Sequence, residues 1–115
     1  MQSQPREKGS IPPDELAHRI ATVLGGRPRG VVEVAGDPDL AGKLGAELGT
    51  FVADDEASSP TVVVDATGSP HVIRGALQRL ADPGLLILTV QLRGNLGHLN
   101  YYEDLHRRGL TVMGI

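Results

Sequence analysis

The chain lacks several residue types, and each absence excludes a class of structure or chemistry. It contains no cysteine, which excludes disulfides, thiolate zinc sites and a cysteine nucleophile. It contains no tryptophan and has three aromatic residues, Phe51, Tyr101 and Tyr102, so aliphatic side chains must fill its core. No apolar run approaches the roughly 20 residues that cross a bilayer, and the first ten residues lack the apolar segment of a signal peptide. We therefore expect a cytoplasmic protein with no membrane partner.

The charge balance is mildly acidic. A formal net charge of −3 and a pI near 5.7 provide no basic surface for phosphate backbones, so we expect no nucleic-acid partner. A chain of 115 residues is long enough for one domain with its own core. Residues 1–12 are polar and interrupted by proline and glycine, which predicts a flexible N-terminal arm before a domain at 13–115.

Residues 61–71 form the most informative stretch. Three consecutive valines at 62–64 make a short β-branched run, typical of a strand that is buried on both faces. The run turns polar at Asp65, and Gly68 favours a tight turn. Ser69 and Pro70 then supply a helix N-cap and a proline at the first helical position. This order of strand, turn and helix is half of a βαβ unit, in which ligands lie at the carboxyl ends of the strands.

The rest of the chain alternates in the same way. Apolar spacing predicts helices over 13–24, 38–48 and 70–80, and a short helix from Asn100 with Glu103 completing a capping box. Apolar runs predict strands at 31–35, 51–53, 61–65, 85–90 and 110–115. The first helix should bury Leu16, Ile20, Val23 and Leu24. We predict an α/β, Rossmann-like domain with a mostly parallel sheet of about five strands flanked by helices.

Two features of these elements need a structural reason. Glu33 lies inside a predicted strand, where a carboxylate requires a partner, and we expect it near a sheet edge or paired with an arginine. Gly42 and Gly45 weaken the helix over 38–48 by about 1 kcal/mol each relative to alanine. We expect them to allow close packing on the sheet.

Polar side chains gather where the predicted strands end. Asp65 with His71, and Tyr101 further along, are candidate catalytic residues, because burial can move an acid and a base toward neutral pKa values. Asp65 is equally suited to accept backbone N–H groups in a turn, and His71 to lie in solvent. His98 and His106 are eight residues apart with no cysteine to assist, so we expect no metal site. The candidate substrate-binding residues are Ser69, Gln91, Arg93, Asn95 and His98.

Taken together, several segments resemble the cofactor-binding half of the medium-chain dehydrogenase/reductase (alcohol dehydrogenase-like) superfamily. The resemblance rests on Val-Val-Val-Asp-Ala-Thr-Gly-Ser-Pro at 62–70, Leu-Ala-Asp-Pro-Gly at 80–84 and the Leu-Leu-Ile-Leu that follows. It continues in Tyr-Tyr-Glu-Asp-Leu-His-Arg-Arg-Gly-Leu-Thr-Val-Met-Gly at 101–114. Upstream, Val-Val-Glu-Val-Ala-Gly-Asp-Pro-Asp at 31–39 and Gly-Ala-Glu-Leu-Gly at 45–49 resemble the family's second strand and helix.

The departures from that family are as informative as the likeness. Nothing corresponds to its zinc-bearing catalytic domain, or to its first strand and Gly-x-Gly-x-x-Gly loop, which bind the pyrophosphate. The acid expected to hold the ribose falls at Gly36, with Asp37 one place on. If a nucleotide binds, the resemblance implies contacts from Gly36, Asp37, Thr67 and Gly68. We expect no cofactor and no tight NAD(P) binding, because the polar groups that fix a dinucleotide are missing.

The missing strand lies at the centre of the family's sheet, in the order 3-2-1-4-5-6. Either the strand at Val31 pairs directly with the one at Thr61, or another segment or subunit fills the gap. The last strand leaves an exposed edge, and exposed edges invite pairing, so we predict a homodimer formed through a sheet edge.

Three functions are consistent with these patterns. The first is a stand-alone remnant of a dehydrogenase cofactor domain, which acts as a non-redox small-molecule-binding protein or biosynthetic tailoring enzyme through acid/base residues at the strand ends. The second is an accessory subunit that pairs through open sheet edges, and the third is an NAD(P)-binding oxidoreductase fragment. Whether the chain is an enzyme is left open. The many polar groups in the loop at 91–100 favour a small-molecule ligand.

Overall fold

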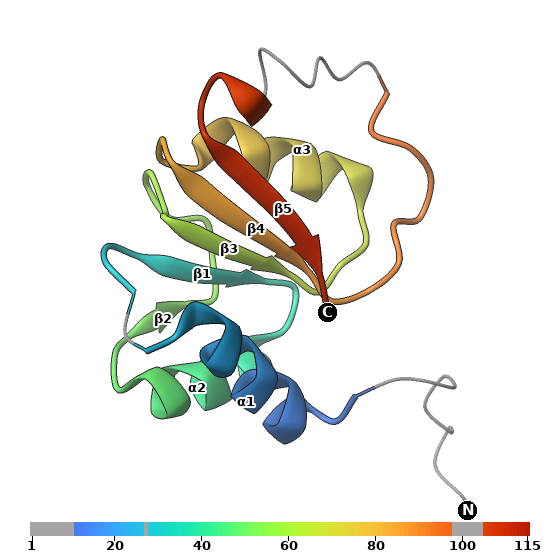
Figure 1. The fold of residues 1–115 in the computed structure, drawn as a ribbon. Coiled ribbons are helices and arrows are strands. Elements are labelled where there is room, and N and C mark those ends of the chain that lie inside the picture. The colour runs from blue at the N-terminus through green and yellow to red at the C-terminus, as the bar shows by residue number, and fades with distance from the viewer. Residues whose placement is uncertain (1–10, 27, 98–104) are drawn as a thin grey trace, which may run out of the picture.

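A computed structural model describes residues 11–26, 28–97 and 105–115. Within these residues, five strands form one parallel sheet in the order β2-β1-β3-β4-β5, flanked by three helices (Figure 1). The elements are α1 (Pro13–Leu24), β1 (Val32–Ala35), α2 (Pro38–Leu48), β2 (Val52–Ala53), β3 (Val62–Asp65), α3 (Pro70–Arg79), β4 (Gly84–Leu88) and β5 (Leu110–Gly114). The predicted α/β, Rossmann-like fold is confirmed.

The sheet has no gap at its centre. β1 pairs directly with β3, with Val32 opposite Val62 and Val34 opposite Val64. This is the first of the two arrangements that the sequence allowed for the missing strand. From β1 the chain crosses to β2 in one direction, and from β3 it crosses to β4 in the other. Because such crossovers are right-handed, α2 and α3 lie on opposite faces, and the winding of the sheet reverses between β1 and β3.

Each face of the sheet has its own core. α1 and α2 pack over Val32, Val34, Val62, Val64 and Ile87, whereas α3 covers Val63 and Leu86 on the other face (Figure 1). The alternation follows from the strand period of two, which sends successive valines to opposite faces. Aliphatic side chains therefore fill both layers, as the shortage of aromatic residues requires.

Two expectations about packing are wrong. Ile20 on α1 is buried as expected, but Val23 is 45% exposed, because α1 turns Ala17 toward the core instead. Gly42 does not pack on the sheet, since a Cβ added there would meet nothing within 4 Å. Gly45 makes room for the turn that leads into β2, where an added Cβ would lie 2.9 Å from the Thr50 carbonyl oxygen.

Some expectations fall outside the described residues. These are most of the arm at 1–12 and the start of the short helix at 100–103, including Asn100 and Glu103. None of the helices in the described part of the chain is long and apolar enough to span a bilayer.

Candidate functional site

The carboxyl ends of β1, β3 and β4 lead into three loops, at 36–37, 66–69 and 89–97. Because β1 and β3 are neighbours, the first two loops meet at the point where the winding reverses. Gly36 has a φ of +90° and lies directly against Thr67, so a Cβ on Gly36 would overlap the Thr67 methyl group. The two loops are therefore in direct contact, and a side chain on Gly36 has no room there.

Asp65 lies at the end of β3 and is fully buried. Its Oδ1 accepts a hydrogen bond from the Thr67 hydroxyl at 2.6 Å, and its Oδ2 accepts one from the Gly68 N–H at 2.9 Å. The Thr67 oxygen in turn accepts from the Ser69 N–H at 3.0 Å. Both carboxylate oxygens are thus engaged by the turn that follows, and Asp65 holds the loop between β3 and α3 in shape.

The two helices that begin at this edge are capped differently. Asp37 accepts a hydrogen bond from the Leu40 N–H at 3.0 Å and caps α2, whose first turn also contains Asp39. Ser69 caps α3 through a longer contact of 3.4 Å from the Val72 N–H, and the first turn of α3 contains no acid. A negatively charged group is therefore disfavoured at the start of α2 and favoured at the start of α3.

The loop after β4 is tied to the turn after β3. The Thr89 hydroxyl and N–H both donate to the Asp65 carbonyl oxygen, and the Arg93 N–H donates to the Gly68 carbonyl oxygen at 2.8 Å. This backbone attachment leaves the side chains of Gln91, Arg93 and Asn95 exposed beside Ser69 and the start of α3.

The structure thus brings one group of predicted site residues to a single edge and separates the others. At the edge lie Gly36, Asp37, Thr67, Gly68, Ser69, Gln91, Arg93 and Asn95. Asp65 lies beneath its turn, whereas His71 is exposed and faces a pocket on the outside of α3. His98 and Tyr101 are outside the described residues.

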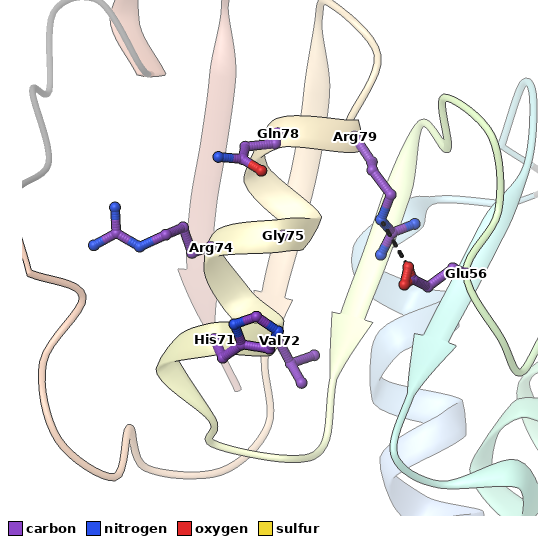
Figure 2. Close-up of a pocket in the computed structure, with 7 residues that line it drawn as sticks. All are labelled: Glu56, His71, Val72, Arg74, Gly75, Gln78 and Arg79. Carbon is purple, nitrogen blue, oxygen red and sulfur yellow. Dashed lines mark ion pairs between the residues drawn. The ribbon is translucent and has the colours of Figure 1, made fainter.

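The pocket on α3 has a volume of about 210 Å³ and is lined by Glu56, His71, Val72, Arg74, Gly75, Gln78 and Arg79 (Figure 2). Gly75 is one of the lining residues, and an added Cβ there would meet nothing within 4 Å. Sequence reasoning missed this pocket. The signal was present as a polar stripe at helical spacing, residues 71, 74 and 78, but such stripes usually mark a solvated helix face.

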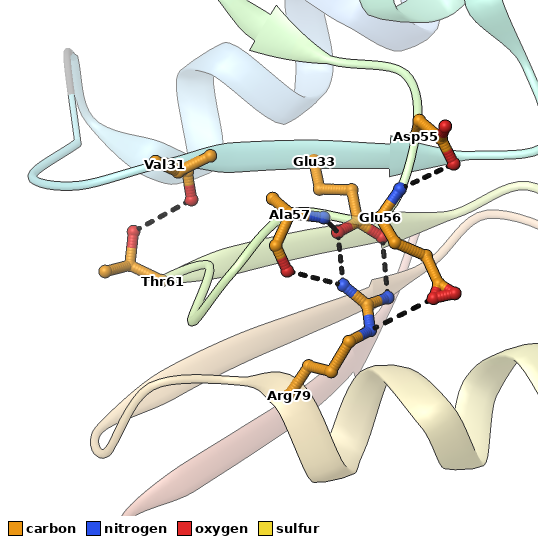
Figure 3. A network of polar contacts seen from close by, with 7 residues as sticks. All are labelled: Val31, Glu33, Asp55, Glu56, Ala57, Thr61 and Arg79. Carbon is orange, nitrogen blue, oxygen red and sulfur yellow. Dashed lines mark hydrogen bonds and ion pairs between the residues drawn. The ribbon is translucent and has the colours of Figure 1, made fainter.

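A buried ion pair lies at the other end of α3 (Figure 3). Glu33 is 1% exposed. Arg79 donates two hydrogen bonds to the Glu33 carboxylate, from Nη1 to Oε1 at 2.6 Å and from Nη2 to Oε2 at 2.9 Å. The Ala57 N–H donates to the same Oε1 at 2.8 Å, and Arg79 donates to the Ala57 carbonyl oxygen at 3.0 Å. The pair therefore fastens the loop at 54–60 to α3.

The bidentate contact with Glu33 raises the pKa of Arg79 above its ordinary value, against the opposing effect of partial burial. Every buried polar side-chain atom in the described residues has a hydrogen-bond partner. Of the two expectations for Glu33, pairing with an arginine is the one observed. This carboxylate is used for structure, and its oxygens are not available to a ligand.

Metal ligands do not gather in the described part of the chain, where no group of three or more His, Asp or Glu side chains is placed to hold an ion. No protein-family model matches the chain, and no curated protein matches it significantly. The likeness to medium-chain dehydrogenases therefore remains a prediction from the residues quoted above.

Proposed function

We propose that this chain binds a small polar molecule, and not a whole dinucleotide, at the carboxyl edge of its sheet. The observation that carries the proposal is the reversal of winding between β1 and β3. In open parallel sheets, the crevice at such a switch point is where ligands bind, because adjacent loops diverge to opposite faces there. The first turns of α2 and α3 and the loop at 89–97 all begin at this edge.

The charges of the edge favour the side nearer α3. The start of α2 carries Asp37 and Asp39, whereas the start of α3 has no acid and has the side chain of Arg93 close to Gly68. Ser69, Gln91 and Asn95 add neutral hydrogen-bonding groups on the same side. A ligand with a carboxylate or phosphate directed at Arg93 and the start of α3 suits this arrangement.

The internal contacts of the edge argue for a ligand smaller than NAD(P). Gly36 is packed against Thr67, and Asp37 caps α2. Thr67 and Gly68 both bind the Asp65 carboxylate. All four residues that the family resemblance assigns to a nucleotide are therefore committed within the protein. We propose a non-redox role, either as a binding protein or as an enzyme in small-molecule biosynthesis.

The proposal is tested by a thermal-shift screen with phosphate, malonate, AMP, NAD and NADP. A ligand at a hundred times its Kd should stabilise the fold by about 2.7 kcal/mol. Arg93→Gln should abolish that stabilisation, whereas Arg19→Gln, an exposed arginine paired with Glu15 on α1, should leave it unchanged. Stabilisation by NAD or NADP but by none of the smaller probes, or equal binding by both variants, would contradict the proposal.

A specific observation also supports a second role, in assembly. Within the described residues, no strand pairs with the outer edge of β5, a five-residue strand that contains neither proline nor charge. Such edges pair readily with another strand. We propose a homodimer through β5. Light scattering at micromolar concentration should give twice the chain mass, and Thr111→Lys, at an exposed position, should give a monomer. A wild-type monomer would contradict this role.

A further inference from the structure

The pocket on the outer side of α3 is centred on Gly75 (Figure 2). On a helix, residues three and four positions apart are neighbours on the surface. Four of the lining residues stand in that relation to Gly75, namely His71, Val72, Gln78 and Arg79. Their side chains surround a position that has none, and a Cβ on Gly75 would meet nothing within 4 Å. The glycine is therefore what leaves the pocket open.

One side of the pocket has a negative charge. The Arg79 guanidinium donates to both oxygens of the Glu33 carboxylate, so its positive charge is already compensated there. Glu56 lies 4.0 Å from Arg79 Nε, which is beyond hydrogen-bond distance, and its side chain is 72% exposed. The Glu56 carboxylate accepts no hydrogen bond from the described residues. Its oxygens can therefore accept hydrogen bonds from an ammonium group of a ligand.

The other side of the pocket has a positive charge. Arg74 and Gln78 extend from α3 on the side of Gly75 that lies away from Glu56 (Figure 2). The Arg74 guanidinium lies beside Gly97, since a Cβ on that glycine would be 2.8 Å from Nη2. Arg74 already interacts within the protein, but a guanidinium has five N–H donors and can serve a second acceptor. A carboxylate is the group that pairs best with it.

We propose that this pocket binds a small zwitterion, with its ammonium group at Glu56, its carboxylate at Arg74 and its carbon chain across Gly75. The volume of about 210 Å³ equals roughly seven water molecules at about 30 Å³ each, which suits a ligand of about seven non-hydrogen atoms. Because the two charges lie on opposite sides of the glycine, several carbons separate the charged groups of the ligand, as in an ω-amino acid. The proposal does not depend on the polar site at the strand ends, because none of the residues proposed for that site lines this pocket.

The test titrates the full-length chain with 4-aminobutyrate, and with butylamine and butyrate, which carry one charged group each. Saturable changes in the amide chemical shifts of residues 71–79 report binding. 4-Aminobutyrate should bind about fivefold more tightly than either single-charge probe. Glu56→Gln should weaken the binding of 4-aminobutyrate and butylamine by about fivefold and leave that of butyrate unchanged. Arg74→Gln should weaken the binding of 4-aminobutyrate and butyrate and leave that of butylamine unchanged.

A second pair of variants tests the space over the glycine. Gly75→Leu fills the pocket and should weaken 4-aminobutyrate binding by about tenfold or more. If that variant does not fold, Gly75→Ala, which favours the helix, should weaken binding to a smaller extent. Gly42→Leu is the matched control, because a Cβ on Gly42 in α2 also meets nothing within 4 Å. It should leave the affinity unchanged, and so should Arg93→Gln, which separates this pocket from the proposed polar site.

Three results would overturn the inference. The first is the absence of saturable 4-aminobutyrate binding at residues 71–79. The second is equal affinity for 4-aminobutyrate in the wild type, Glu56→Gln and the Gly75 variants. The third is loss of binding in the Gly42→Leu control, because the probe would then be bound on α2.

Discussion

Replacing Arg79 with methionine should destabilise the fold far more than an ordinary surface change. Glu33 is 1% exposed, and without Arg79 its carboxylate keeps only the N–H of Ala57. Breaking a buried ion pair by removing one partner costs about 3–5 kcal/mol, because the remaining charge is left without compensation. The Arg79 side chain is itself 25% exposed, so water can partly replace it, and we expect the lower end, about 3 kcal/mol.

For a chain of this length, that loss corresponds to a fall in Tm of roughly 12 °C. Urea unfolding followed by circular dichroism measures the free energy directly. The control is Arg19→Met, which breaks the exposed pair with Glu15 and should cost less than about 1 kcal/mol.

The double variant Glu33→Met/Arg79→Met completes the test. It removes both charges and replaces them with apolar chains, so it should be more stable than Arg79→Met alone by about 2 kcal/mol. If Arg79→Met were no less stable than Arg19→Met, or if the double variant were less stable than Arg79→Met, the assignment of this pair as a buried clamp would be refuted.

Three further tests concern the charge of Arg79, two glycines and the turn at Asp65. The pKa of Arg79 is raised in the folded protein, so the stabilisation by its charge is fully present below the pKa that arginine has in the unfolded chain. That stabilisation is lost only as the pH rises through the pKa of Arg79 in the folded protein. The difference in unfolding free energy between wild type and Arg79→Met should therefore stay constant between about pH 7 and pH 10 in urea titrations. Gly75→Ala should raise the unfolding free energy by up to about 1 kcal/mol, because the new Cβ meets open space in a helix. Gly36→Ala should lower the unfolding free energy by about 1–3 kcal/mol, because Gly36 has a positive φ and its new Cβ would overlap the Thr67 methyl group. The reverse order of the two stabilities in calorimetry would contradict the geometry. Asp65→Asn should lower the unfolding free energy by about 1–3 kcal/mol and make residues 66–69 more sensitive to proteolysis, because an amide cannot accept a hydrogen bond at both positions. An unchanged Tm would contradict the turn network.

Much of the fold was predictable because local patterns specify it. The valine run at 62–64 predicts a buried strand, which is observed as β3. The observed starts of α2 and α3 are marked by Asp37-Pro38 and Ser69-Pro70. The apolar stripe of α1 was predicted only in part, because Ile20 is buried as expected whereas Ala17 is buried in place of Val23. Which of them faces inward depends on how α1 meets α2.

The arrangement between elements was harder to predict. The sequence shows that Glu33 needs a partner, but Arg79 is 46 positions away and is selected by the packing of α3 against the sheet. Direct pairing of β1 with β3 was one of two possibilities, because strand order is decided by long-range contacts. The predicted pairing of Asp65 with His71 treated them as neighbours, although one points into the turn and the other lies on the exposed side of α3.

Binding of a small polar ligand at the carboxyl edge of the sheet, beside the start of α3, is tested most directly by amide chemical-shift mapping during titration with phosphate, AMP and NADP. We predict that a small anionic probe shifts the amides of residues 66–69 and 91–97, and that NADP binds no more tightly than AMP. Shifts confined to other surfaces, or NADP binding much more tightly than AMP with changes across all the strand ends, would contradict it.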